Sequence, residues 1–360
     1  MKRVLLSSLL LIYVVTMMAQ EKEVLIDSIY YRINIKDRTA MVIHELMDES
    51  SYEDESKMYV GDIIIPEKIS IDRKRYTVIA IEDGAFINCH ALTSIKIPSS
   101  VYYIGRYAFR CCSALRDIEI PNSVTQIGNS AFEDCRLLEN ITLSKSITSI
   151  ETSLFSHCSS LKNIDIPNSV TIIKGYAFKD CLSLRSITIP GSVTTIGEYA
   201  FDGCENLVNV KIPNSVSMIK ESAFGGCSAL IDIEIPSSVT TINELCFFGC
   251  SSLTNIKIPN SVTMIKELAF NGCSALTDIE IPSSVTTIKR CAFADCTALK
   301  SITMRPTTPP ETEGSIFCNC TQPIDIFVPP GTEKMYKIYP WYNYCIIDKS
   351  IIMMIEEEEP

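Results

Sequence analysis

The apolar and polar positions of the chain repeat in the same order every 23 residues over most of its length. Each unit reads L-x-x-I-x-I-P-x-S-V-x-x-I-x-x-x-A-F-x-x-C, with departures such as Val210, Lys145 and Leu154. A repeat of this length predicts an array of small units that pack on one another. The units are marked by Phe86, Phe109, Phe132, Phe155, Phe178, Phe201, Phe224, Phe247, Phe270 and Phe293, each followed three residues later by cysteine, and by Phe317 after a step of 24.

Each unit contains signals for two extended segments and a tight turn. L-x-x-I-x-I alternates apolar and polar residues, which predicts a strand with one wet face. The proline that follows ends this strand because it has no N–H to donate, and Pro-Asn-Ser or Pro-Ser-Ser favours a turn. V-x-x-I predicts a second, shorter extended segment. A-F-x-x-C has the spacing of a single helical or 3₁₀ turn, with Phe and Cys on one side.

A single unit cannot bury its own apolar residues, but a copy stacked on each side can cover them. The sequence therefore predicts a repeat solenoid with a parallel β-sheet on one face and short extended segments and helical or 3₁₀ turns on the others. Neighbouring strands of such a sheet lie about 4.8 Å apart.

Both ends of the chain depart from the repeat, as the open ends of a stack require. Residues 24–35 and 40–46 predict a β-hairpin in a β-rich N-terminal cap. Residues 324–328 predict a strand and residues 332–339 a short helix in the C-terminal cap. The expected segments are a signal peptide at 1–19, the N-terminal cap at 20–62, the repeat array at 63–304, an altered last repeat with the C-terminal cap at 305–345, and a tail at 346–360.

The first residues have the plan of a secretory signal peptide. Lys2 and Arg3 precede an apolar run at 4–15, which is too short to span a bilayer, and Ala19 provides a small residue for cleavage. We expect an exported protein that is secreted, periplasmic or held at the cell surface. Because the first cysteine is Cys89, we expect no N-terminal lipid, and no later segment is apolar and long enough to span a membrane.

The formal net charge of -11 changes the range of expected partners. Nucleic acids and anionic membrane surfaces both attract proteins with clustered Lys and Arg. The acidic balance, without a basic stripe, therefore argues against both as partners.

The unit I-P-S-S-V-T-T-I-x-x-x-A-F-x-x-C-x-x-L resembles the BspA-like class of leucine-rich repeats, which occurs in exported and surface proteins of Bacteroidetes and related mucosal microbes. Residues 324–344 are also similar to the closing segment of bacterial members, so the resemblance covers about residues 63–345. It implies a leucine-rich repeat fold and a role in adhesion to host matrix proteins or to other microbes. No short binding motif of the family can be placed on this chain.

The cysteines of the repeat predict buried, reduced thiols. Equivalent residues of adjacent units keep their Cβ atoms near the strand spacing of about 4.8 Å, beyond the usual disulfide range of about 3.5–4.5 Å. A metal or redox array and scattered disulfides stay open as alternatives. Outside this column, Cys111, Cys291 and Cys318 would be the reactive thiols, and a Cys318–Cys345 bridge is conceivable.

No set of residues suggests catalysis, a cofactor or a metal. His44, His90 and His157 fall in different settings and do not converge, and His44-Glu45 lacks the second histidine of H-E-x-x-H. The sequence contains no G-x-S-x-G, no glycine-rich phosphate loop and no paired-cysteine metal motif. We therefore expect a protein that is not an enzyme.

The wet face of the predicted sheet is the candidate binding surface. Lys211, Glu234, Lys257 and Glu280 alternate in sign along the second half of the array, so we expect them to satisfy one another. The first half is less regular and is expected to offer unmatched charge. The candidate ligand-binding residues are Lys96, Arg116, Asp117, Glu119, Asn140, Lys162, Asp165 and Arg185.

These observations predict a non-catalytic, exported binding or adhesion protein whose repeat surface recognises a protein or glycan ligand, such as host matrix or another microbe. A preformed sheet offers a wide surface without an ordering cost. The alternative is a structural role, in which the array self-associates or spaces other components of the cell envelope.

Overall fold

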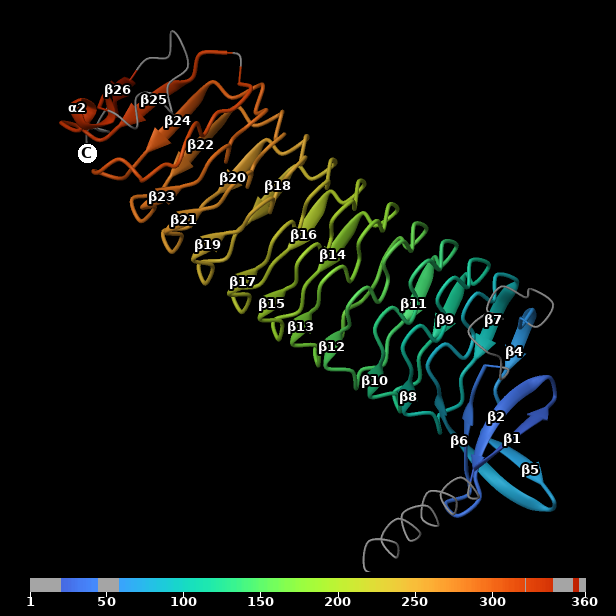
Figure 1. The fold of residues 1–360 in the computed structure, drawn as a ribbon. Coiled ribbons are helices and arrows are strands. Elements are labelled where there is room, and N and C mark those ends of the chain that lie inside the picture. The colour runs from blue at the N-terminus through green and yellow to red at the C-terminus, as the bar shows by residue number, and fades with distance from the viewer. Residues whose placement is uncertain (1–20, 45–57, 321, 339–351, 356–360) are drawn as a thin grey trace, which may run out of the picture.

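The computed structural model describes residues 21–44, 58–320, 322–338 and 352–355. The chain winds into an elongated stack of similar coils, with a small β-sheet at the N-terminal end and the strands β24 (Ser301–Met304), β25 (Asp325–Val328) and β26 (Ile352–Met354) at the other end (Figure 1). The predicted parallel solenoid with a 23-residue period is confirmed.

The alternating segment of each coil forms the longer of two strand ladders, here called the long-strand ladder. Its side chains alternate between exposed and buried, as in β18, where Ile233 is buried between two exposed neighbours. Strands pair in parallel with equivalent residues opposite one another, for example Ile233 opposite Ile256. The strands are β7 (Leu92–Lys96), β9 (Asp117–Glu119), β11 (Asn140–Thr142), β14 (Ser186–Thr188), β16 (Asn209–Lys211), β18 (Asp232–Glu234), β20 (Asn255–Lys257), β22 (Asp278–Ile281) and β24 (Ser301–Met304).

The V-x-x-I segments form a second ladder of two-residue strands, here called the short-strand ladder. Figure 1 shows it running along the opposite side of the stack from the long-strand ladder. Its members are β8 (Tyr103–Ile104), β10 (Gln126–Ile127), β12 (Ser149–Ile150), β13 (Ile172–Ile173), β15 (Thr195–Ile196), β17 (Met218–Ile219), β19 (Thr241–Ile242), β21 (Met264–Ile265) and β23 (Thr287–Ile288).

The core between the ladders is built from columns of identical residues. The phenylalanine rings from Phe86 to Phe293 are fully buried and stack on one another, with adjacent ring centroids 5.2 to 5.9 Å apart. The cysteines form the neighbouring column, and each thiol from Cys112 to Cys296 points at a backbone carbonyl of the preceding coil: Cys204 Sγ lies 3.1 Å from Phe178 O. The predicted burial of phenylalanine and cysteine in one core is confirmed.

The A-F-x-x-C segment consists of tight turns. Amides donate to carbonyls three residues earlier, as Cys204 N does to Phe201 O at 3.1 Å, which is the 3₁₀ type of bond. A helix does not continue because the residues two before and two after phenylalanine are left-handed, for example Tyr199 with φ 54° and Gly203 with φ 74°. Backbone in this region reverses the chain direction.

The N-terminal cap contains one turn more than predicted. The expected strand over residues 24–35 is divided into β1 (Glu21–Ile26) and β2 (Ile29–Asn34) by Asp27 and Ser28, whose φ angles are 48° and 64°. Two such residues make the tight turn that suits a two-residue hairpin. The predicted hairpin is therefore the second of two, and it pairs β2 with β3 (Thr39–Val42).

A third hairpin joins the cap to the array. Residues 68–81 form two strands that pair antiparallel, β5 (Lys68–Ile71) and β6 (Lys74–Ile81). β6 also pairs in parallel with β3 and with the first strand of the short-strand ladder, β8. β4 (Gly61–Ile64) pairs with β7 and begins the long-strand ladder.

The C-terminal strand and helix are where the sequence predicts them. β25 (Asp325–Val328) extends the long-strand ladder, and the helix α2 (Glu333–Tyr336) falls inside the expected helix. The tail, for which no element was predicted, adds a further parallel strand, β26 (Ile352–Met354), on β25. The predicted signal peptide lies outside the described residues. Among the described residues, no helical segment has the length and apolar character needed to cross a bilayer.

Candidate binding surface

The eight candidate residues all lie on the exposed side of the long-strand ladder or at the start of its strands, between β7 and β14. Each of the eight side chains is exposed. Strand pairing places some of them next to one another, so that Asn140 Nδ2 donates a hydrogen bond to Asp117 Oδ1 at 2.7 Å from the adjacent strand.

Glu139 ties two of the predicted residues together. Arg116 Nη1 lies 3.2 Å from Glu139 Oε1, and Lys162 Nζ lies 2.5 Å from Glu139 Oε2. The hydrogen bond from Lys162 and the charges of both cations lower the pKa of the Glu139 carboxyl. Sequence reasoning missed Glu139, although it occupies the same repeat position as Arg116 and Lys162, one coil away from each.

The expected contrast between unmatched and matched charges is wrong. Glu234 stands opposite Lys257 in the ladder, yet neither of them, nor Lys211, takes part in an ion pair within the described residues. Exposed pairs gain little from direct contact because water screens them, so strand register alone does not bring the charged groups together. Glu280 does form an ion pair, with Arg305 Nη2 at 2.9 Å.

Arg185, like Lys96, is a predicted cation that keeps its charge available. In the part of the chain that the structure describes, neither side chain has an ion-pair partner. Arg185 and Lys162 line one shallow depression of about 360 Å³ together with Asn163, Ser183 and Asn206. This depression combines two cations with amide and hydroxyl groups on adjacent coils.

A second depression of about 270 Å³ adjoins the first and contains Asp165. It forms where the long-strand ladder is interrupted, because residues 163–165 adopt no strand and do not bridge β11 to β14. Asn163 lines both depressions. The structure therefore brings Lys162, Asp165 and Arg185 together around one unpaired segment.

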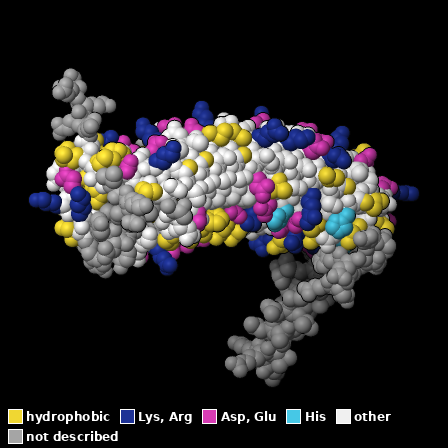
Figure 2. Space-filling model, turned by 90° about the horizontal axis from the view of Figure 1, so that it is seen from above, with side chains coloured by type: hydrophobic (Ala, Val, Ile, Leu, Met, Phe, Trp, Pro, Cys, Tyr) yellow, Lys and Arg dark blue, Asp and Glu magenta, His cyan; other side chains and the backbone are white. Residues whose placement is uncertain are grey.

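Lys96 and Glu119 form a separate part of the surface. They line a depression of about 360 Å³ between β7 and β9, which also do not pair. A further depression, of about 520 Å³, lies away from all eight candidates, on the short-strand ladder. On the face shown in Figure 2, Lys and Arg are interspersed with Asp and Glu and do not gather into one large patch.

The predictions for the cysteines are partly confirmed. The column cysteines from Cys89 to Cys296 are free and buried, and burial raises the pKa of each of their thiols. The predicted reactivity of Cys111 has no support, since burial and then the charge of Asp134 raise the pKa of its thiol.

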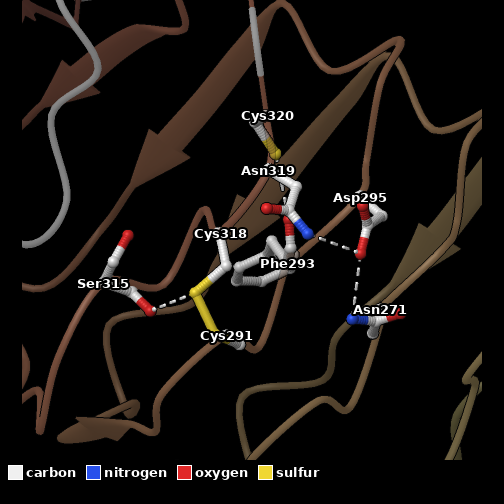
Figure 3. Close-up of a disulfide and its surroundings, with 8 residues drawn as sticks. All are labelled: Asn271, Cys291, Phe293, Asp295, Ser315, Cys318, Asn319 and Cys320. Atoms are coloured by element: carbon white, nitrogen blue, oxygen red, sulfur yellow. Dashed lines mark hydrogen bonds between the residues drawn. A yellow bond between two sulfur atoms is a disulfide. The ribbon is translucent and has the colours of Figure 1, made fainter.

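The other predicted reactive cysteines form a disulfide. Cys291 and Cys318 are bonded, with their Cα atoms 5.2 Å apart (Figure 3). Cys318 therefore pairs with Cys291 and not with Cys345, which lies outside the described residues. Cys291 precedes its phenylalanine by two residues and Cys318 follows Phe317 by one. Because the two cysteines occupy different repeat positions, the strand spacing that keeps equivalent Cβ atoms too far apart for a disulfide does not apply to them.

The histidines that flank the cysteine column each have a local partner. His90 Nδ1 lies 2.9 Å from Cys111 O, and His157 Nδ1 lies 3.3 Å from Asp180 Oδ2. Across the described residues, no three His, Cys, Asp or Glu side chains converge as metal ligands would.

The comparisons with known proteins agree with this architecture. The model of the BspA-type leucine-rich repeat region matches residues 79–208, 171–300 and 240–352. No curated protein matches the chain.

Solved structures of bacterial repeat proteins are also similar. A leucine-rich repeat protein from Bacteroides ovatus is 27% identical, covers 92% of this chain and 100% of its own, and superposes with a TM-score of 0.54. A leucine-rich cell surface protein from Faecalibacterium prausnitzii is 27% identical, covers 92% of this chain and 99% of its own, with a TM-score of 0.50.

The pneumococcal vaccine antigen PcpA supports the fold alone, since it is 16% identical, covers 93% of this chain and 99% of its own, and has a TM-score of 0.50.

One assignment accounts for the repeat period, the two ladders, the phenylalanine and cysteine columns, and the match of the family model over most of the array. This chain belongs to the BspA-type leucine-rich repeat family.

Proposed function

We propose that this protein is an exported, non-catalytic binding protein that recognises a protein or glycan ligand through the long-strand surface between β7 and β14. The observation that carries this proposal is the arrangement around residues 163–165, where Lys162, Asp165 and Arg185 border two adjoining depressions. Arginine is frequent at the energetic centres of interfaces, and Arg185 has no intramolecular ion pair among the described residues to lose on binding.

The rigidity of the array supports the same proposal. Stacked phenylalanines and backbone bonds between coils fix the backbone that carries the exposed side chains before a ligand arrives, so little backbone entropy is lost on binding. Host matrix or the surface of another microbe is the proposed source of the ligand.

Export is supported by two observations. The Cys291–Cys318 disulfide is of a kind that persists in oxidising compartments outside the cytosol. A family member of similar length from Faecalibacterium prausnitzii is described as a cell surface protein. We propose that this chain is likewise secreted, periplasmic or held at the surface, after removal of residues 1–19.

The proposal is tested by capture and mutation. The chain from Gln20 onward is immobilised, exposed to host matrix and bacterial surface extracts, and the captured ligand is identified and titrated. Arg185→Ala is expected to weaken binding by about tenfold, or about 1.4 kcal/mol.

Lys300→Ala is the matched control, because Lys300 is an exposed cation at the same repeat position near the other end of the array. It is expected to leave the affinity unchanged. Equal losses in the two variants would place the ligand elsewhere. A chain that captures nothing but self-associates in sedimentation would support the structural role instead.

A further inference from the structure

The short-strand ladder is open at two places, here called seams, where neighbouring strands do not pair. One seam separates β10 from β12 and the other separates β17 from β19. The remaining neighbours from β6 to β23 are paired in register. Figure 1 shows β17 and β19 following one another along this side of the stack.

The second seam lacks backbone bonds that its neighbours make. In adjacent coils Lys220 N donates to Ile196 O at 3.0 Å, and Lys266 N donates to Ile242 O at 2.9 Å. The equivalent amide of Asn243 makes no such bond, and its side chain reaches Ile219 O instead, with Nδ2 at 2.6 Å. Among the described residues, no backbone hydrogen bond joins 217–219 to 240–243.

Both seams coincide with a change in one buried column. The residue before phenylalanine is alanine in the other coils from Phe86 to Phe293, but it is Leu154 at the first seam and Cys246 at the second. Both side chains are buried, with 0% and 1% exposure. A larger side chain in a close-packed column forces its neighbours apart.

The core distances record this separation. Ring centroids are 5.8 Å apart between Phe132 and Phe155 and 5.9 Å apart between Phe224 and Phe247, which are the two seams. The other stacked pairs up to Phe293 are 5.2 to 5.5 Å apart. The bond from Phe224 N to Cys246 O is also longer, at 3.0 Å, than the 2.8 Å bond from Phe201 N to Ala223 O in the preceding coil.

The second seam opens into a depression of about 520 Å³. This volume is in the range of small-molecule sites, which span about 300–1,000 Å³. The first seam opens into only about 250 Å³. The difference in volume favours the Cys246 seam as the site of a ligand.

The lining of this depression indicates what it can hold. Three carboxylates and two ammonium groups stand around it, and Glu198 pairs with Lys220 at 3.3 Å. The amides of Thr240 and Asn243 and the carbonyl of Ser217 have no partner across the seam. Met218, which is 48% exposed, supplies an apolar surface beside these polar groups.

An inserted peptide strand does not fit. It would require the flanking strands to stand about 9.6 Å apart, twice the normal spacing. The two coils are held closer than this by the pairing of β16 with β18 on the other ladder and by the bond from Phe224 N to Cys246 O. A ligand must therefore lie over the seam and meet its edges from outside.

We propose that the seam between β17 and β19 binds a neutral saccharide, and that Cys246 holds this seam open. Sugar hydroxyls both donate and accept hydrogen bonds, so they match the amides and the carbonyl that have no partner across the seam, and a neutral ligand suits a rim of mixed charge. The C–H face of a sugar ring can lie on Met218. This site is on the opposite ladder from the surface proposed above and does not depend on it.

The test measures binding of D-glucose, D-galactose, N-acetyl-D-glucosamine and their β-linked disaccharides by saturation-transfer NMR. Cys246→Ala restores the alanine of neighbouring coils and is expected to close the seam, slow the amide exchange of Thr240 and Asn243, and weaken binding by at least about tenfold. Leu154→Ala is the matched control, since it acts on the other seam and should leave binding intact.

A second variant guards against a general loss of structure. Asn243→Lys introduces the residue that adjacent coils carry as Lys220 and Lys266 and removes the hydrogen bond from Nδ2 to Ile219 O, and it should weaken saccharide binding while unfolding stays cooperative. If none of the sugars binds, the saccharide site is overturned. It is also overturned if Cys246→Ala protects the amides of Thr240 and Asn243 from exchange but leaves saccharide binding unchanged. Stronger binding of the zwitterion glycylglycine would overturn the ligand class, and fast exchange in Cys246→Ala would overturn the role of Cys246.

Discussion

Replacing Phe201 by alanine removes one ring from the middle of the buried phenylalanine column. The ring is 0% exposed and stacks on Phe178 at 5.2 Å and on Phe224 at 5.4 Å. Truncation of a buried phenylalanine costs about 3–5 kcal/mol, and each aromatic contact adds about 0.5–1.5 kcal/mol to simple burial. The range of about 3–5 kcal/mol already includes lost contacts of this kind, and since two are lost here, we expect the free energy of unfolding to fall by an amount in its upper part, about 4–5 kcal/mol.

The cavity cannot close easily. Phe201 N donates to Ala223 O at 2.8 Å, and Cys227 Sγ lies 3.2 Å from Phe201 O, so the backbone on both sides of the lost ring is fixed by its neighbours. The cost depends on how far a site can collapse, and this site can collapse little. Because each coil supports the next, the loss should spread to adjacent coils.

The measurement is urea unfolding followed by far-UV circular dichroism. Phe248→Ala is the control, because Phe248 is 43% exposed and its loss should cost less than about 1 kcal/mol. An unchanged midpoint for Phe201→Ala, or equal shifts for the two variants, would refute the stacked core as the main source of stability.

Two other predictions concern thiols and charge. Cys204 and Cys227 should resist alkylation in the folded protein, since burial raises the pKa of both thiols, and should react on denaturation without reductant. Cys318 should react only after reduction of its disulfide. Mass spectrometry of the alkylated peptides measures both outcomes. The pKa of Glu139 is lowered in the folded state, so its pairing with Lys162 stabilises the protein above the unfolded-state pKa and is lost as pH falls through the folded value. An NMR titration in which Lys162→Ala leaves the Glu139 pKa unchanged would contradict this.

The period, the stacking and the buried columns could be predicted from the sequence. In an array of near-identical units, each apolar residue packs against the equivalent residue of the next unit. Contacts in the core can therefore be predicted from the repeat position alone. The strand Asp325–Val328 and the helix Glu333–Tyr336 were predictable for a different reason, since local alternation and spacing determine them.

The candidate surface was only partly predictable. Exposure of the eight residues follows from strand alternation, but the grouping of Lys162, Asp165 and Arg185 does not, because it depends on the missing strand at 163–165. The ion pairs of Glu139 and the lack of pairing at Lys211 likewise depend on side-chain conformation, which register alone leaves open.

The sequence by itself determined the repeat and the identity of every core column, including the places where alanine gives way to Leu154 and Cys246. Only the tertiary structure decided what those changes do. Where Cys246 replaces alanine with a side chain larger by one sulfur atom, the ring spacing is 5.9 Å between Phe224 and Phe247, against 5.4 Å between Phe201 and Phe224, and the adjacent short strands do not pair. Close packing passes the separation of the two coils on to their short strands, and hydrogen bonds tolerate little stretching. A small change in the core therefore opens a seam whose position the sequence marks but whose effect only the packed structure shows.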